Sequence, residues 1–385
     1  MIQSLAYWVV LIVAATIHWR LPRRWRPGFV AATSAALLAT VAPWVVLGLG
    51  VWTTSFALLL RREAWRKTAF VAFFTGLILQ LALFKYLPPL MPSFFGADFL
   101  VPLGLSFFTF KLLHYGVEVL RGNLPAHPVS EVLAWIFLFP IFTAGPIERF
   151  DHFRDQAEPE WSPQATVEGI TRIVHGLIKR FFLGEMVIGN LPGGEGPAVM
   201  LDRLDTLSSG EVWLFTILSF LRLYMDFSGY TDIAIGSARL FGYRIVENFN
   251  WPLLSDSPRN FWQRWHISLA DWCRDYVFYP VFGRFRRPLL ALYATFFVMG
   301  LWHDGSPHWI LWGVYQGTGV AAHAVWTRLR KRRKWKWPDR KPFHALCVVA
   351  TFLFICAAQS FTSLNRIAPI EDSFRVLGRL LFLPI

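Results

Sequence analysis

Residues 222–252 read RLYMDFSGYTDIAIGSARLFGYRIVENFNWP, and they are followed by FWQRWHISLADWCRDYVFYP at 261–280 and GLWHDGS at 300–306. Histidines, asparagines, tryptophans and Asp/Arg pairs are concentrated in these stretches of a chain that is otherwise mostly apolar. Polar and ionisable groups at membrane depth cost free energy, so such a cluster indicates a functional site. We therefore expect the function to lie in this part of the chain.

The apolar sequence around these stretches predicts the fold class. The chain has 385 residues, of which 55% are hydrophobic and 17% aromatic, with a mean hydropathy of +0.40. Apolar blocks of about 18 residues or more suit helices that cross a hydrocarbon core of about 30 Å. The strict alternation of a membrane β-barrel is absent. The sequence predicts an all-α polytopic membrane protein, with one domain over residues 1–385 and its core motifs at 101–317.

Several blocks are short or interrupted by Pro or Gly, so the prediction is about 9 to 12 crossings. Residues 256–282 are too charged to cross but rich in aromatic residues, which favours an amphipathic or re-entrant helix. Residues 151–166 are predicted to form a loop. The candidate membrane segments are residues 4–19, 28–42, 44–60, 68–84, 99–119, 131–147, 165–190, 211–225, 228–242, 288–302, 307–326 and 343–361.

Net charge is +13, from 38 basic and 25 acidic residues. In a soluble protein this would suggest nucleic acid as a partner, but here the basic residues gather between apolar blocks. Lys and Arg favour cytoplasmic loops, so we expect these clusters on the cytoplasmic side and exclude nucleic acid. The first apolar block lacks a basic region before it and has one after it, which predicts a retained helix with an extracytoplasmic N-terminus. The basic clusters are Arg20–Arg26, Arg61–Lys67, Arg284–Arg287 and Arg328–Lys341, and the last of these could also contact anionic lipid.

Five ordered segments resemble the membrane-bound O-acyltransferases, and among them the bacterial branch of alginate O-acetylation and teichoic-acid D-alanyl transfer proteins. The segments are VPLGLSFFTFKLLHYGVEVLRG (101–122), FLFPIFTAGPIERF (137–150), YMDFSGYTDIAIGSARLFGYRIVENFNWP (224–252), FWQRWHISLADWCRDYVFYP (261–280) and GLWHDGSPHWILWGVYQG (300–317).

This resemblance implies a ring of membrane helices around a central funnel, in the bacterial inner membrane, with His303 as the catalytic histidine and His266 as a second family histidine. After His303 the family text is closer to Gly-Ala-Ser, whereas this chain has Asp304, Gly305 and Ser306. The longer C-terminal part of the alginate-type proteins is also expected to be lacking. These departures bear on the substrate more than on the chemistry.

The two histidines suit acyl transfer. His303 follows an apolar run and precedes a small polar turn; it would act as a general base, removing the proton from an acceptor hydroxyl that attacks a thioester. His266 would orient the acceptor or stabilise the oxyanion. The structural alternative for His303 is a histidine at a helix end that is hydrogen-bonded to a backbone carbonyl. The alternative for His266 is an interfacial histidine that is hydrogen-bonded for packing.

Other polar residues are candidates for substrate binding, each with a structural alternative. Arg264 and Arg274 could bind a phosphate of the acyl donor, or pair with Asp271 and Asp275. Trp302, next to His303 in the sequence, is a further predicted substrate-binding residue.

Three more candidates for substrate binding, Asp226, Asn248 and Asn250, lie in the stretch from 222 to 252. Asp226 and Asp232 lie near Arg222, and an ion pair is the plainer explanation for them. Asn248 and Asn250 could line a polar pocket, or act in turns and caps.

We expect no bound cofactor and no metal. The donor would be an acyl thioester, acetyl-CoA or a phosphopantetheine carrier, as cosubstrate. His303 and His308 have no third ligand nearby in sequence and no HExxH occurs, while Cys273, Cys347 and Cys356 form no metal or disulfide pattern.

The predicted function is transfer of a short acyl group, acetyl, to a hydroxyl of an extracytoplasmic polysaccharide, envelope polymer or relay protein. A periplasmic acyltransferase is a further expected partner, beside membrane lipid. D-alanyl transfer from a carrier protein shares the mechanism and stays open. Rivals of other classes are a transporter or flippase, which would show inverted repeats, and an inactive scaffold.

Overall fold

The computed structural model describes residues 2–87, 104–157, 160–335 and 341–383. Within these ranges the regular structure is helical, and β pairing is limited to two isolated bridges, Ala157 with Tyr243 and Phe249 with Trp265. The predicted all-α class is confirmed. The start of the candidate segment 99–119 and residues 336–340 of the last basic cluster lie outside the described residues.

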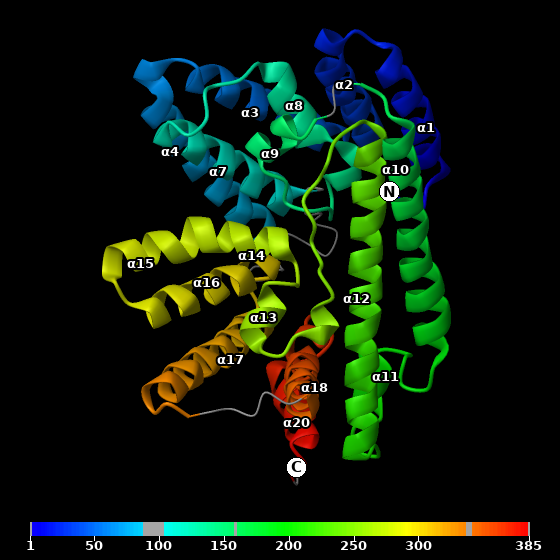
Figure 1. The fold of residues 1–385 in the computed structure, drawn as a ribbon, viewed down its shortest axis with the longest axis vertical. Coiled ribbons are helices and arrows are strands. Elements are labelled where there is room, and N and C mark those ends of the chain that lie inside the picture. The colour runs from blue at the N-terminus through cyan, green and yellow to red at the C-terminus, as the bar shows by residue number, and fades with distance from the viewer. Residues whose placement is uncertain (1, 88–103, 158–159, 336–340, 384–385) are drawn as a thin grey trace. The chain divides into compact units, whose positions relative to one another are not determined.

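The chain divides into two compact units. Unit 1 comprises Met1–Gly176 and Tyr230–Val246, and unit 2 comprises Leu177–Gly229 and Glu247–Ile385. The long helix α12 (Ser209–Leu240) begins in unit 2 and ends in unit 1 (Figure 1). The single domain and the funnel stay predictions.

Unit 1 contains most of the N-terminal apolar helices. Proline stands in the first turn of α2 and α3, where its missing N–H costs nothing and its fixed φ suits a helix start. The helices are α1 (Leu5–Arg20), α2 (Arg26–Ala39), α3 (Pro43–Leu60), α4 (Arg66–Leu81) with a π-helical extension (Ala82–Tyr86), α7 (Leu105–Arg121), α8 (Val129–Phe137), α9 (Phe150–Asp155), α10 (Pro163–Leu177, whose last residue belongs to unit 2) and the end of α12.

The predicted membrane segment 131–147 is wrong. Helix α8 has 9 residues, about 13.5 Å at the α-helical rise, which is too short to cross a core of about 30 Å. It ends at Phe137, and Pro140 could not continue it because proline has no N–H to donate to the carbonyl four residues earlier; a short 3₁₀ turn (Phe139–Ile141) follows. The predicted loop 151–166 likewise contains α9 and the start of α10.

Helices α10 and α12 pack through glycines within unit 1. A Cβ atom at Gly236 would lie 2.5 Å from the carbonyl oxygen of Gly169, and one at Gly169 would lie 2.9 Å from that of Gly236. Such small residues allow close helix approach. An ion pair between Arg172 and Asp232, 2.5 Å from Nε to Oδ1, connects the same helices. Asp232 therefore pairs with Arg172, and the predicted partner Arg222 is wrong.

Unit 2 contains both predicted catalytic histidines, His266 and His303, with the segments around them, residues 261–280 and 300–317. The segments 211–225 and 228–242, predicted as separate, are one continuous helix of 32 residues, so that boundary is wrong: Gly229 does not interrupt it. The helices are a π-helical segment (Ile178–Val187), α11 (Pro197–Asp202), the start of α12, α13 (Pro258–Trp262), α14 (Ile267–Cys273), a π-helical turn (Arg274–Phe278), α15 (Tyr279–Phe285), α16 (Pro288–His303), α17 (Pro307–Arg332), α18 (Lys341–Ala357), α19 (Gln359–Thr362) and α20 (Ile370–Leu380).

The region 256–282 is not the single amphipathic helix that was one interpretation. It is broken between α13 and α14, where the backbone of residues 264–268 is bonded instead to residues 248–250. His266 occupies this break with φ of 45°, a left-handed conformation.

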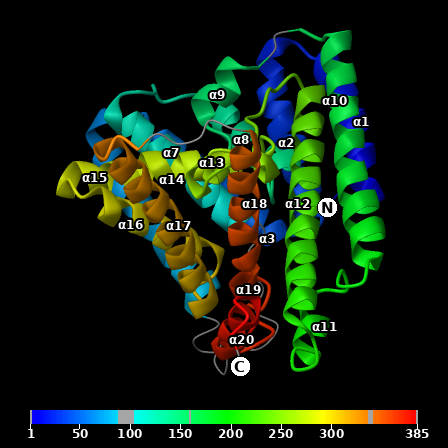
Figure 2. The same cartoon turned by 60° about the horizontal axis from the view of Figure 1, so that its bottom comes forward.

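Helices α16 and α17 lie side by side in both views (Figures 1 and 2). A Cβ atom at Gly313 would lie 2.5 Å from the Phe296 carbonyl oxygen, so glycine permits the contact. Small residues commonly allow membrane helices to approach this closely.

Length and composition identify three helical stretches within the described ranges that could cross a membrane. These are Pro43–Leu60, Glu63–Tyr86 and Lys341–Thr362, and Leu5–Arg20 and Pro288–His303 are shorter apolar helices.

Candidate active site

His303 is the last residue of α16, and tryptophans surround its imidazole. The ring stacks on the indole of Trp309 from α17, with centroids 4.0 Å apart and planes 11° from parallel. Trp302 and Trp312 also lie against it, at centroid distances of 4.6 and 5.5 Å. Any side chain at Gly300 would clash with the Trp309 carbonyl, so this glycine lets α17 bring Trp309 onto the ring. His303 remains partly exposed, as a group that meets a substrate must be.

His266 lies close by in unit 2, at the N-cap of α14, and is only 3% exposed. Its ring packs edge-on against Phe227 at 4.8 Å and lies 6.0 Å from the ring of Trp302. Within the described ranges no group hydrogen-bonds its Nε2. Burial lowers the pKa of His266, so the ring is neutral at neutral pH. Trp302 thus neighbours both predicted catalytic histidines.

Asn248, Asn250 and Arg264 build the loop that carries His266. The Asn248 Oδ1 atom accepts from the Ser268 hydroxyl at 2.6 Å and from its backbone N at 3.4 Å, so it caps α14. The Asn250 N–H donates to the Arg264 carbonyl at 2.9 Å, and the Arg264 guanidinium donates back to the Asn250 carbonyl at 3.2 Å. The turn and cap roles are confirmed, and substrate contacts of these three residues stay predictions.

Asp226 is paired, but with a different arginine from the one predicted. Arg180 Nη2 lies 3.1 Å from Asp226 Oδ1, whereas Arg222 donates to the Gly194 carbonyl at 3.4 Å. The predicted Asp226–Arg222 pair is wrong because the π-helical segment, distant in sequence, supplies the cation. A role of Asp226 in substrate binding stays a prediction.

Arg274 bonds to both of its predicted acidic neighbours. Its guanidinium lies 2.5 Å from Asp271 and 2.8 Å from Asp275. The predicted pairing is therefore confirmed for Arg274, whereas Arg264 is bonded to Asn260 and Asn250 instead. Binding of a donor phosphate by Arg274 stays a prediction.

Metal binding finds no support in the described residues, where no three side chains of His, Cys, Asp and Glu come together in a group that could hold an ion. The predicted absence of a metal and of a bound cofactor stays a prediction.

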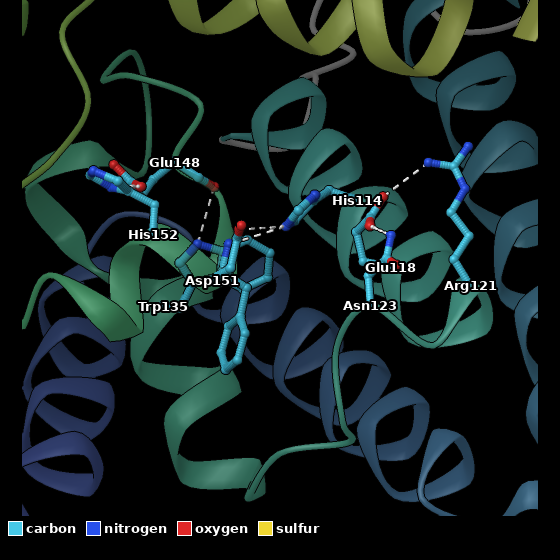
Figure 3. Close-up of polar contacts among 9 residues, drawn as sticks. His114, Glu118, Arg121, Asn123, Trp135, Glu148, Asp151 and His152 are labelled. Atoms are coloured by element: carbon cyan, nitrogen blue, oxygen red, sulfur yellow. Dashed lines mark hydrogen bonds and ion pairs between the residues drawn. The ribbon is translucent and has the colours of Figure 1, made fainter. Parts of the chain in front are cut away.

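A second polar cluster, in unit 1, was missed in the sequence (Figure 3). Glu148, whose side chain is fully buried, accepts from His152 Nδ1 at 2.7 Å and from the Val246 N–H at 2.8 Å. The Trp135 indole donates to the Glu148 carbonyl at 3.1 Å. Pairing with Glu148 raises the pKa of His152. The cluster ties α8, α9 and the chain after α12 together.

The same cluster continues toward α7. His114 points at the start of α9, where its Nε2 accepts from the Phe150 N–H at 3.2 Å and lies 3.5 Å from Asp151 Oδ1 (Figure 3). The spacing of Glu148 and His152, four residues apart, was the available signal. No pattern in the sequence joined them to Val246 or His114.

The family model described as MBOAT, membrane-bound O-acyltransferase family, matches residues 51–367. The chain belongs to this family. It is an integral membrane protein, and both His303 and His266 fall within the matched residues. The resemblance found in the five motifs is thereby confirmed.

Three curated relatives show the range of named activities. The chain is 35% identical to a probable alginate O-acetylase of Pseudomonas aeruginosa over 60% of this chain and 44% of the relative. It is 30% identical to a teichoic acid D-alanyltransferase of Bacillus subtilis over 66% of each. It is 26% identical to a peptidoglycan O-acetyltransferase of Helicobacter pylori over 72% of this chain and 56% of the relative. The chain spans less than half the length of the alginate relative.

Proposed function

We propose that this member of the family transfers an acetyl group from a thioester to a hydroxyl of an extracytoplasmic envelope polymer. The observation that carries the proposal is the pair His303 and His266, which share Trp302 as a neighbour inside the matched region. The named activities of the three relatives, O-acetylation of alginate or peptidoglycan and D-alanylation of teichoic acid, support it.

The chemistry follows from the two imidazoles. His303 accepts the proton of the acceptor hydroxyl as its oxygen forms a bond to the thioester carbonyl carbon. The resulting oxyanion is stabilised by an N–H of His266, a buried neutral ring without another partner on Nε2 among the described residues. The carbon–sulfur bond then breaks, and the thiolate takes the proton from His303. The products are an ester and a thiol.

The tryptophans around His303 serve this reaction in two ways. The stacked indole of Trp309 fixes the plane of the imidazole, and such orientation lowers the entropic cost of the step. The apolar rings also exclude water, which protects the thioester from hydrolysis.

The direction of transfer follows from the charge distribution. Helix α16 begins after the basic residues 284–287 and α17 ends in a basic run. Because basic loops favour the cytoplasm, the turn after His303 would lie toward the opposite side, from which the acceptor would come. The donor, acetyl-CoA or an acyl carrier, would approach from the cytoplasm of the bacterial inner membrane, and a periplasmic acyltransferase could complete delivery.

A second candidate is D-alanyl transfer from a carrier protein. The match with the teichoic acid relative covers 66% of each chain, whereas the match with the alginate relative covers 44% of that relative. The steps at His303 would be the same in D-alanyl transfer.

The donor assay tests the proposal. Purified protein is incubated with labelled acetyl-CoA, acetylated carrier or D-alanylated carrier, together with isolated envelope polymer, and ester formation is measured by mass analysis. We expect acetyl transfer that His303→Ala reduces about 10²–10⁴-fold, while His175→Ala, an exposed histidine on α10, leaves the rate unchanged. A wild-type rate in His303→Ala would contradict the general-base role, and transport without ester formation would favour the transporter.

A further inference from the structure

The turn that follows His303 is anchored by a buried carboxylate. Asp304 directly follows the last residue of α16, and its N–H donates to the Gly300 carbonyl at 3.1 Å. The residue is only 4% exposed. Its Oδ2 atom accepts from Arg366 Nε at 2.9 Å and from Asn365 Nδ2 at 3.0 Å. Ser306, at the other end of the turn, donates to Asn365 Oδ1 at 2.7 Å. Both ends of the turn are therefore bonded to residues 365 and 366.

Residues 364–368, which carry Asn365 and Arg366, are held in place by packing and by backbone hydrogen bonds. Leu364, directly before Asn365, is fully buried in an apolar cluster with residues of α11, α12, α18 and α20. The N–H groups of Ile367 and Ala368 both donate to the Leu364 carbonyl at 3.1 Å, so the backbone folds tightly around Arg366. Arg366 itself has φ of 68°, a left-handed conformation that costs free energy for a residue with a side chain.

A buried charge and a strained backbone both cost free energy. Strained residues persist where the surrounding contacts hold them in place, and they cluster at functional sites. Here they meet one residue after His303. A displacement of about 1 Å in a catalytic group can reduce a rate about 10²-fold. An anchor at this place therefore acts on the placement of the imidazole.

We propose that Asp304, held by Arg366 and Asn365, is a positioning residue for His303. The inference rests on the proposed function and adds the residues that tune it. Asp304 itself does not touch the substrate. It fixes the end of α16, and thereby the distance and angle at which His303 meets the acceptor hydroxyl.

The test removes the ion pair as a unit. In Asp304→Ala with Arg366→Gly no carboxylate is left buried without its cation, and glycine suits the left-handed φ at position 366. We expect kcat to fall about 10- to 100-fold and KM for the thioester to stay within about twofold. We expect Tm to change little, because relief of the left-handed backbone strain at position 366 offsets the loss of the ion pair. Asp304→Asn, whose amide oxygen still accepts from both donors, should retain most of the rate.

The matched control is another ion pair of unit 2. Arg375 on α20 lies 2.9 Å from Asp372 and 2.6 Å from Asp205. Asp372→Ala with Arg375→Ala therefore removes ion pairs of unit 2 that have no hydrogen bond or ion pair to the turn after His303 among the described residues. This variant should keep the wild-type kcat. An unchanged kcat in the Asp304/Arg366 variant, or a loss equal to that of the control, would overturn the proposal.

A second measurement does not depend on turnover. The rate at which diethyl pyrocarbonate modifies His303, followed by peptide mass analysis, reports how firmly the ring is held against Trp309. We expect faster modification in the Asp304/Arg366 variant than in wild type or control, and equal rates would count against the proposal. If wild type forms no ester with any donor, the proposed function fails, while this rate still decides whether Asp304 positions His303.

Discussion

At the scale of single residues, His266 depends on a backbone conformation that few side chains tolerate. Its φ of 45° is left-handed, a region that Asn visits more readily than most residues with a side chain. The Asn248 cap and the Asn250–Arg264 bonds hold the loop in this shape. Replacement by alanine would therefore mix a backbone effect with the loss of the imidazole.

His266→Asn separates the two effects. Because asparagine suits the left-handed backbone, we expect this variant to unfold near the wild-type Tm. Loss of the oxyanion donor should lower kcat about 10²–10³-fold, measured as thioester turnover in detergent. If kcat stays at the wild-type value while Tm is unchanged, His266 is a packing residue and the oxyanion role is excluded.

At the residue level, the sequence singled out residue types that are unusual for their surroundings, and the catalytic roles assigned to them stay predictions. His303 and His266 stood out because polar groups in an apolar chain are costly, and both lie beside Trp302. The predicted partner of Asp226 and Asp232 was wrong. Asp226 pairs with Arg180 and Asp232 with Arg172, and both arginines come from outside α12. Helical spacing reveals only pairs within one helix, and the anchor formed by Arg366 is likewise distant in sequence from Asp304.

At the scale of elements, the crossing of α10 and α12 shows how a single glycine can decide a helix contact. A methyl group at Gly236 would meet the backbone of Gly169 and Ile173 at 2.5 to 2.9 Å, and backbone cannot move aside as a side chain can. Gly28 on α2 is the opposite case, since a Cβ atom there would have nothing within 4 Å.

Gly236 and Gly28 give two predictions of opposite sign. Gly236→Ala should destabilise the protein by about 1–3 kcal/mol through overpacking. Gly28→Ala should stabilise it by up to about 1 kcal/mol, because alanine has the higher helix propensity. Thermal unfolding of both variants in detergent checks the two signs, and equal shifts would show that α10 and α12 do not pack at Gly236.

The short helix α9 gives a pH-dependent prediction. Glu148 raises the pKa of His152, so the pair stabilises the folded state fully below the unfolded pKa of about 6.5. This contribution is lost as pH rises through the folded pKa. We expect the stability advantage of wild type over His152→Gln to shrink as the pH rises above about 6.5. The advantage should be below about 1 kcal/mol, because the imidazole is 36% exposed and solvent screens the pair.

The control for this measurement is His175→Gln on the exposed side of α10. This substitution leaves the Glu148–His152 pair in place, so the loss of that pair should appear only in the comparison with His152→Gln. An advantage of wild type over His152→Gln that grows toward high pH would contradict the assigned sign.

Element boundaries were the least predictable part of the fold. Length and hydropathy identified most helices, yet α8 ends at Phe137, shortly before Pro140, and α12 continues past Gly229. Whether glycine or proline ends a helix depends on packing that the local sequence does not show. The break at His266 arises in the same way, from bonds to residues 248–250.

At the scale of the whole molecule, the basic clusters predict which helix ends face the cytoplasm. The loop at residues 61–67 carries a basic cluster, and the loop at 40–42, one helix earlier, carries no charge. If α3 crosses the bilayer, the bias of Lys and Arg toward the cytoplasm places the first loop inside and the second outside. The same rule places the N-terminus of α1 outside, because Arg20 ends that helix.

Single cysteines test this orientation. Cys273 and Cys356 are buried, so Cys347→Ala gives a background of low reactivity. Val41→Cys, at a position 63% exposed, should be labelled by a membrane-impermeant maleimide in intact spheroplasts. Glu63→Cys, an exposed position that removes no basic residue, should be labelled only after permeabilisation. The reverse pattern would invert the orientation predicted for α3, and would remove the support for applying the same charge rule to α16 and α17.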